Sequence, residues 1–341
     1  MTVHLSPTNA SPFISYIVKT GAGWFGVDLF FVLSGYLITG LLLDSAGRPG
    51  YYRNFVARRT LRIFPLYFAC LILACVVDFG PWPIRWKDFS GFGGWWYPAF
   101  LGNIPVFLQN RWPSGGMTPL WSLQIEEQFY LTFPFLVATL PRKTLTRLLL
   151  ASIVAAPLLR TGMLFLMPAN ITGTYVLMPC RMDALAMGGL IAIAWRDFPE
   201  YLRGRWIAFA TAASAVLVLC ICWEFTPSPW GSAMRTVGFS ATDAAFAGIL
   251  VMVATQRQRF LLWLCRLRPL VWIGTISYGL YLLHSPVTEL VRRASPALHI
   301  PSGGVNESLL SLAASLAAAW TSWKFFESPI LRLRDRLTAR G

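Results

Sequence analysis

Ionisable residues inside apolar runs are the first candidates for chemistry in this sequence. Asp28 lies in "GVDLFFVLSGYLITGLLL" (26–43), a run otherwise apolar enough to cross a membrane, and Glu126 and Glu127 lie in "WSLQIEEQFY". A charge at membrane depth is costly, so such a residue marks a functional site by default. Asp28 and Glu126 each need a partner, and Arg181 or a histidine could supply it.

Further titratable groups are expected at the level of these acids. Arg181 and Asp183 open "RMDALAMGG", His284 lies in "SYGLYLLHSP", and His4 is near the start of the chain. Together with the acids they come from five separate segments at the level of the outer leaflet, so we expect a shared, partly wet cavity. Three simpler interpretations stay open: Arg181 and Asp183 could snorkel to the interface, His284 could cap a helix end, and Glu127 could be interfacial.

A second polar level is predicted at the inner membrane surface. "ARRTLRIFPLY" places Arg59 and Arg62 three residues apart, hence on one helix face if a helix begins there. Two guanidiniums suit a phosphorylated cytosolic ligand, because arginine forks onto phosphate oxygens. The alternative is the ordinary excess of positive charge on the cytoplasmic side.

The elements that position these groups are predicted to be membrane-spanning helices. Of the 341 residues, 55% are hydrophobic and 13% charged, against about 25% charged in soluble domains. We predict an all-α polytopic membrane protein whose apolar runs approach the ~20 residues that a crossing needs. The nine predicted spans are 24–43, 62–79, 121–140, 148–166, 177–195, 206–223, 236–255, 270–290 and 308–326. A further segment, 95–108, is broken by Pro98, Gly102 and Pro105, and is interpreted as interfacial or re-entrant.

Charge and cysteine usage narrow the class of protein. The net charge is +14, but the basic residues form short clusters between apolar runs, mostly on one side of the predicted membrane. This bias places the C-terminus in the cytoplasm and argues against a nucleic-acid partner. The six cysteines show neither a CxxC pair nor metal-ligand spacing, so we expect free thiols and no metal site.

Six sequence blocks, taken in order, resemble a known family. They are "GVDLFFVLSGYLI", "RRTLRIFPLY", "WSLQIEEQFYLTFP", "RMDALAMGGLIA", "ISYGLYLLHSPV" and "FFESPILR". This series is similar to the acyltransferase-3 family of integral membrane O-acyltransferases, over nearly the whole chain. The resemblance implies a ten-helix membrane domain in the bacterial cytoplasmic (inner) membrane. It also implies transfer of an acyl group, usually acetyl, from coenzyme A to a hydroxyl of an extracytoplasmic glycan.

The resemblance also sets the expected organisation. We expect one acyltransferase domain over 1–341, with 1–5 as the remnant of the family's first helix and 80–120 as an extracytoplasmic loop. His4 corresponds to the family's catalytic histidine, but the family's arginine eleven residues earlier has no counterpart. Most of the first helix is therefore expected to be absent, with activity in question if Met1 is the true start.

Catalytic roles follow from the resemblance together with general chemistry. His4 is expected to act as general base on the acceptor hydroxyl, or to form an acyl-histidine. Asp28 or Glu126 would hold its imidazole in the right tautomer, as in a catalytic triad. Arg181 would balance the acids or stabilise the thioester oxyanion. Arg59 and Arg62 match the family's Arg-x-x-Arg element on the coenzyme A side.

Substrate contacts are expected from three further residues. Asp183 and His284 are candidates to bind the acceptor, and His284 could also serve as a second base. Ser34 belongs to a Ser-Gly notch that would let helices or the pantetheine arm approach closely. Acyl-CoA is the expected donor, with no permanently bound cofactor, and the expected partners are a saccharide acceptor and the lipid bilayer.

Two other functions stay open on sequence grounds. Buried acids and a Ser-Gly notch also suit a transporter or flippase of a lipid-linked saccharide, although the sequence shows no inverted repeat. A degenerate, non-catalytic family member is the other alternative.

Overall fold

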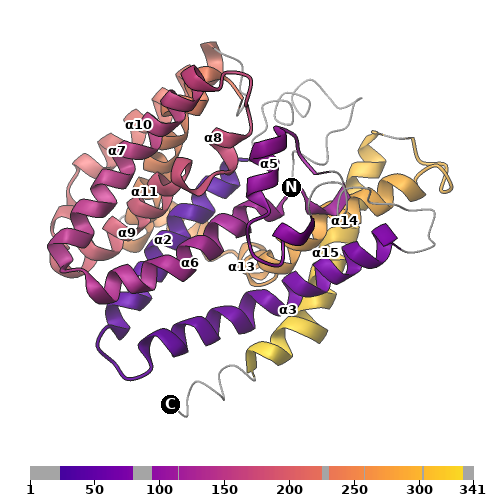
Figure 1. Cartoon of the computed structure of the whole chain (residues 1–341), viewed down its shortest axis with the longest axis horizontal. Coiled ribbons are helices and arrows are strands. Elements are labelled where there is room, and N and C mark those ends of the chain that lie inside the picture. Colours follow the sequence, from indigo (N-terminus) through magenta and orange to yellow (C-terminus); the bar gives the residue numbers. More distant parts are fainter. Residues whose placement is uncertain are drawn as a thin grey trace. The chain divides into compact units, whose positions relative to one another are not determined.

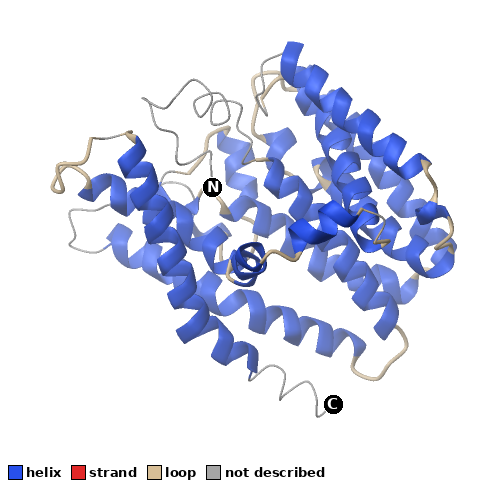
Figure 2. Ribbon diagram, turned by 180° about the vertical axis from the view of Figure 1, so that it is seen from behind, coloured by secondary structure: helices blue, strands red, loops and turns tan. Residues whose placement is uncertain are grey.

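The computed structural model describes residues 24–79, 94–113, 115–224, 230–256, 258–301 and 303–332. Every regular element in these ranges is a helix, which confirms the predicted all-α class (Figures 1 and 2). The chain divides into two compact units. Unit 1 contains Tyr52–Gln124 and Arg268–Gly341, and unit 2 contains Thr20–Tyr51 and Ile125–Leu267.

Unit 2 is built mainly from helices that pack in sequence-distant pairs. Helix α2 packs along α9 and against α11, α9 also packs on α7, and α10 packs on α11. The elements that contribute to the unit are α2 (Phe25–Ser45), most of α6 (Leu120–Thr139), α7 (Arg142–Leu166), α8 (Gly173–Val176), η4 (Met178–Cys180), α9 (Met182–Asp197), η5 (Tyr201–Arg203), α10 (Trp206–Glu224), η6 (Met234–Gly238), α11 (Phe239–Ala254) and α12 (Arg259–Cys265).

Glycines set the close contact between α2 and α9, which lie side by side in Figure 1. Gly35 faces the backbone of Leu185, and Gly188 faces the carbonyl of Val32, so a Cβ atom at either glycine would overlap backbone. Small residues allow helices to approach this closely in membranes. The predicted role of the Ser-Gly notch in helix approach is therefore confirmed for Gly35.

Helix α2 shows apolar side chains on its exposed face as well as its buried face. Leu29, Phe30, Leu33 and Leu37 are all exposed, whereas the opposite face is buried in the unit. An apolar outer face of this kind suits lipid contact. In the described part of the chain, four helices are long and apolar enough to cross a membrane, and they are Phe25–Ser45, Tyr51–Val76, Arg142–Leu166 and Met234–Ala254. The chain is a membrane protein, and the count of nine spans stays a prediction.

Unit 1 combines one long helix with a pair of packed helices. Helix α14 packs on α15 and on the short η3, as Figure 1 also shows for α14 and α15. Its elements are α3 (Tyr51–Phe79), η2 (Gly94–Trp96), α5 (Asn103–Gln109), η3 (Gly115–Met117), the first residues of α6, α13 (Arg268–Thr275), α14 (Ser277–Ala294), α15 (Val305–Ser322) and η7 (Trp323–Glu327).

Two predicted spans have different boundaries in the structure. The run 270–290 forms two helices, because α13 ends at Thr275 and α14 begins at Ser277. Gly274, Thr275 and Ser277 are weak helix formers, which accounts for the break. Helix α3 begins at Tyr51, well before the predicted start at 62.

The segment 95–108 forms no long helix. Its main element, α5, has seven residues and is about 10 Å long, too short to cross a membrane. The helix ends at Gln109, and the next residue, Asn110, adopts a left-handed conformation with φ 47°. This agrees with counting the segment as non-spanning.

Candidate functional site

A cluster of buried charges forms the candidate site in unit 2. Asp28 of α2 is ion-paired with Arg181, the residue before α9, and both side chains are completely buried. The guanidinium carbon of Arg181 lies 4.2 Å from the ring centroid of Phe239, with the rings of Phe31 and Tyr175 within 6 Å. Of the two kinds of partner expected for Asp28, the structure shows the arginine.

A second ion pair lies in the same cluster. Arg160 of α7 contacts Asp183 of α9 at 2.9 Å (Nη2 to Oδ2), and both side chains are fully buried. Ser240 donates to the same carboxylate oxygen at 2.6 Å, and Arg160 also donates to the carbonyl oxygens of Cys180 and Thr236. The snorkelling interpretation of Asp183 is therefore wrong, because its carboxylate is held inside the unit, and the complete burial of Arg181 excludes it there too.

The cluster contains a third carboxylate that the sequence reasoning missed. Asp243 of α11 is completely buried, and neither of its oxygens receives a hydrogen bond from the described residues. It interacts electrostatically with Asp183, Arg181 and Arg160. With Asp28, the cluster thus holds three acids and two guanidiniums. Asp243 is the only charged residue in the run 236–255, so the criterion applied to Asp28 would also have found it.

Three residues connect α2 and α6 through hydroxyl groups. The Tyr130 hydroxyl donates to Glu126 Oε1 at 2.8 Å and lies 2.6 Å from Ser34 Oγ. Since the phenol hydrogen is used by the carboxylate, Ser34 donates to the Tyr130 oxygen. The Ser34 hydrogen therefore ends on Tyr130, and the Tyr130 hydrogen ends on Glu126, which is buried. Glu127 is buried as well, which argues against an interfacial position for it.

In unit 1, His284 has a defined tautomer. Its Nδ1 lies 2.7 Å from the carbonyl oxygen of Tyr281 and 3.2 Å from that of Leu280. A carbonyl oxygen can only accept, so Nδ1 carries a hydrogen, and Nε2 is the ring nitrogen that could exchange a proton with a substrate. His284 is buried in the interior of α14, so the helix-cap interpretation is wrong.

Arg59 and Arg62 lie within α3, so the condition for their sharing one helix face is met. Arg59 lies over Phe55, with 5.9 Å between the guanidinium carbon and the ring centroid, and Arg62 is exposed. Arg62 interacts electrostatically with Glu327, a buried acid that accepts a hydrogen bond from Ser322 at 2.8 Å. Glu327 belongs to the "FFESPILR" block but was not singled out from the sequence.

The predicted site residues thus fall in both units. Unit 2 holds Asp28, Ser34, Glu126, Arg181 and Asp183, and the structure joins them as two ion pairs and one hydroxyl relay. Unit 1 holds the arginine pair and the candidate second base on α14. The histidine expected as catalytic base, residue 4, lies outside the described residues, as do 1–5 and most of the first half of 80–120.

Comparison with known proteins decides the family. The model of the acyltransferase domain family (Acyl_transf_3) matches residues 1–324. The chain belongs to this family. No solved structure matches it.

Curated relatives of this acyltransferase-domain protein carry consistent names. It is 29% identical over 331 residues to the peptidoglycan O-acetyltransferase OatA of Listeria monocytogenes, covering 90% of this chain and 51% of the relative. Identity is also 29% to the putative peptidoglycan O-acetyltransferase YrhL of Bacillus subtilis, with 90% and 50% covered. For the O-acetyltransferase OatA of Staphylococcus aureus it is 28%, with 90% and 52% covered. The chain spans about half the length of the curated relatives it matches.

Proposed function

We propose that this protein transfers an acetyl group from cytosolic acetyl-CoA to a hydroxyl of an extracytoplasmic glycan, at the bacterial cytoplasmic membrane. The observation that carries the proposal is the family match over residues 1–324, joined to three relatives that are each named as O-acetyltransferases. Two of those names specify peptidoglycan, which makes an amino-sugar polymer the first acceptor to test. The proposal includes the nine spans and the cytoplasmic C-terminus.

In this proposal the donor binds at the arginine pair of α3. Arg62 is exposed and Arg59 lies one turn before it on the same helix, and guanidinium groups at this spacing suit the phosphates of coenzyme A. The pantetheine arm then runs along the helices of the domain toward the acceptor side. The donor is a substrate that leaves as free coenzyme A, so no permanently bound cofactor is required.

The chemical step requires a base, because a sugar hydroxyl is a weak nucleophile. The hydroxyl oxygen attacks the thioester carbonyl, the carbon–sulfur bond breaks, and the proton removed by the base is returned to the coenzyme A thiolate. In unit 1, Nε2 of His284 is a proton acceptor in a buried environment, since Nδ1 holds the hydrogen against Tyr281. His4, as implied by the family resemblance, is the other candidate base.

Unit 2 contributes charge and orientation in this proposal. Arg181 balances the buried acids of unit 2, since it is fully buried and ion-paired with Asp28. Ser34 donates to Tyr130 and Tyr130 donates to Glu126, a relay that helps to orient that carboxylate. Asp183 is occupied by Arg160, which favours a positioning role over direct acceptor contact.

Purified protein in lipid vesicles tests the proposal. Acetyl-CoA is supplied with an oligomer of N-acetylglucosamine as acceptor probe, and both coenzyme A release and the mass of the oligomer are followed. His284→Asn is expected to lower the rate ~100-fold or more, the contribution of a general base. His299→Asn is the matched control, because His299 is exposed and its left-handed backbone, φ 54°, accommodates asparagine.

Two outcomes would contradict the proposal. If intact protein moves a lipid-linked saccharide across the vesicle without consuming acetyl-CoA, the transporter alternative is correct. If neither reaction occurs, and variants at Asp28, Glu126 and His284 are silent in cells at equal protein level, the chain is a non-catalytic family member. If His284→Asn and His299→Asn lower the rate equally, His284 is not the base. The proposed acetyl transfer would still stand.

A further inference from the structure

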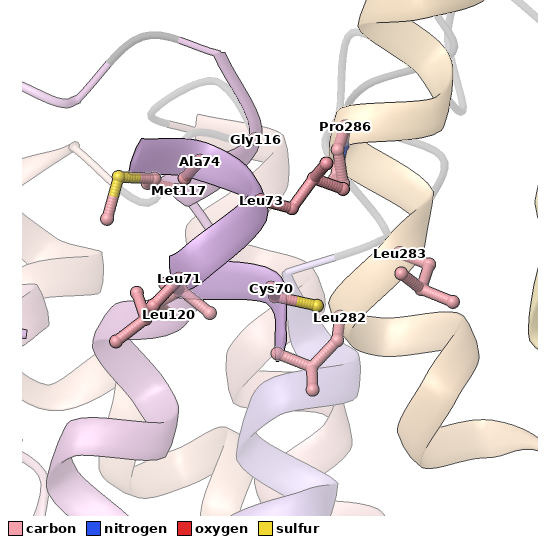
Figure 3. Close-up of a pocket in the computed structure, with 10 residues that line it drawn as sticks. All are labelled: Cys70, Leu71, Leu73, Ala74, Gly116, Met117, Leu120, Leu282, Leu283 and Pro286. Atoms are coloured by element: carbon pink, nitrogen blue, oxygen red, sulfur yellow. The ribbon is translucent and has the colours of Figure 1, made fainter. Parts of the chain in front are cut away.

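Unit 1 contains a small cavity that the roles above do not use. Its lining consists of nine apolar residues and Cys70, from α3, η3, the start of α6 and α14. Figure 3 shows Cys70 and Leu73 of α3 facing Leu282 and Pro286 of α14 across it. Its volume is about 20 Å³. A cavity needs roughly 10–15 Å³ to hold one water-sized group, so this one has room for a single small group.

The wall of the cavity is closed tightly on the η3 side. A Cβ atom at Gly116 would lie 2.8 Å from Cβ of Pro286, which is closer than two such carbons pack. Pro286 lies within α14 and has no N–H, so it cannot donate the helix hydrogen bond to the carbonyl of Leu282. The cavity is thus an apolar recess with a backbone acceptor at one edge.

The cavity and the arginine pair share one face of α3. Cys70 and Leu73 follow Arg62 by eight and eleven residues, spacings that keep residues on one side of a helix. At 1.5 Å per residue, Cys70 lies about 12 Å along the helix axis from Arg62. A donor whose phosphates bind at Arg62 can therefore reach the cavity along a single helix face.

We propose that this cavity receives the methyl end of the donor's acyl group and restricts the reaction to acetyl. The inference rests on the proposed acyl-CoA-dependent function and adds the determinant of acyl length. The lining is apolar, as a methyl group requires, and a volume of about 20 Å³ matches one small group. A longer acyl chain is therefore expected to press on Leu282 or Leu120. His284 does not line the cavity but follows two residues that do, Leu282 and Leu283, on the same helix. The methyl group and the base are therefore assigned to neighbouring positions of α14.

Comparing donors of different acyl chain length tests the role of the cavity directly. Wild type and variants in lipid vesicles receive acetyl-CoA, propionyl-CoA or butyryl-CoA with the N-acetylglucosamine oligomer, and coenzyme A release is compared. Leu120→Ala enlarges the cavity, so the rate with butyryl-CoA relative to acetyl-CoA is expected to rise ~10-fold or more, the discrimination typical of one methylene in a pocket. Leu123→Ala is the matched control, because Leu123 is equally buried on the same helix and does not line the cavity.

A filling variant tests the same site in the opposite direction. Ala74→Val places two additional methyl groups in the cavity wall and is expected to lower the acetyl-CoA rate at least 10-fold, with free coenzyme A inhibiting as in wild type. Ala319→Val, at a buried alanine of the same unit away from the cavity, controls for overpacking. Leu282→Ala replaces Leu120→Ala if that variant does not fold.

The outcomes separate the two proposals. An unchanged chain-length ratio in both Leu120→Ala and Leu282→Ala, with acetyl transfer retained, would overturn the cavity's role and leave the function intact. Absence of coenzyme A release from every donor with folded wild-type protein would overturn the proposed function and the cavity's role together. A shifted ratio in Leu120→Ala but not in Leu123→Ala supports both.

Discussion

The two units stabilise their buried polar groups in different ways. Unit 2 uses full charges: Asp28 is ion-paired with Arg181, and Asp183 with Arg160, with all four side chains completely buried. Unit 1 relies more on neutral groups, although Glu307 and Glu327 are buried in it as hydrogen-bond acceptors. Its interior hydrogen bonds run from Tyr67 to the carbonyl of Tyr97, from Gln124 to Tyr67, from Ser122 to Tyr281, and from Tyr278 to the carbonyl of Ile63.

The difference predicts unequal tolerance to substitution. Removing one member of a buried ion pair leaves an uncompensated charge, which costs about 3–5 kcal/mol. Removing one member of a neutral hydrogen bond costs about 0.5–1.5 kcal/mol, or somewhat more if the other group is left unpaired. Substituting one charged residue of a buried ion pair in unit 2 should therefore lower the free energy of unfolding strongly. Removing a single hydroxyl in unit 1 should lower it only modestly.

The largest effect is expected for Arg181→Met. This change leaves Asp28 buried without its cation, so the free energy of unfolding is expected to fall by about 3–5 kcal/mol. The double variant Asp28→Leu/Arg181→Met removes both charges and is expected to recover most of that loss. Unfolding midpoints in one detergent, followed by tryptophan fluorescence, provide the measurement.

A surface pair supplies the control for this experiment. Arg142 lies 3.8 Å from Asp197, and both side chains are partly exposed. Arg142→Met is expected to cost at most about 1 kcal/mol, as exposed ion pairs do. If the double variant is as unstable as Arg181→Met alone, the buried pair is not what stabilises this part of unit 2, and the contrast between the units fails.

The sequence predicted the ionic interior better than the neutral one. An acid or arginine in an apolar run is visible because lipid and protein interiors both penalise charge, so Asp28, Arg181 and Asp183 were found, and Asp243 was findable by the same criterion. Their pairing was not fully predictable, since it depends on how α2, α7, α9 and α11 meet. Gly35 and Gly188 determine one of these contacts through backbone proximity, which a single sequence indicates only as small residues.

The neutral interior left almost no signal in the sequence. Tyrosine is common near span ends, where the aromatic belt explains it without any specific partner. Serine and glutamine carry no charge that would make them conspicuous in an apolar run. The tautomer of His284 depends on carbonyl oxygens three and four residues earlier, and so on α14 continuing through Pro286. The cavity beside Cys70 depends on three separate segments meeting. The helices themselves were predicted, whereas the break between α13 and α14 was not predicted, although Gly274, Thr275 and Ser277 indicate it.

An intermediate effect is expected for Tyr281→Phe in unit 1. The hydroxyl of Tyr281 donates to the carbonyl of Pro119 at 2.8 Å and lies 2.5 Å from Ser122. Ser122 lies 3.4 Å from the same carbonyl, so it can redirect its hydrogen when the phenol is removed. The free energy of unfolding is expected to fall by about 1 kcal/mol, against no change for Tyr201→Phe, at an exposed tyrosine. A loss of 3 kcal/mol or more, the cost of a broken buried ion pair, would show that the neutral network is as sensitive as the ionic one.

The smallest effect on stability is expected for Asp243→Asn. This variant tests whether the buried cluster of three acids and two guanidiniums holds one acid too many. Asp28 and Asp183 each have a guanidinium in direct contact, whereas Asp243 receives no hydrogen bond from the described residues. Asparagine has the same shape and removes the acid that exceeds the two guanidiniums, so stability is expected to stay within about 0.5 kcal/mol of wild type or to rise. Asp183→Asn makes the same change at a paired acid and is expected to lower the free energy of unfolding by about 3–5 kcal/mol.

If both variants are equally destabilised, Arg181 divides its charge between Asp28 and Asp243. The cluster would then be a single network of three acids rather than two ion pairs with an additional carboxyl group.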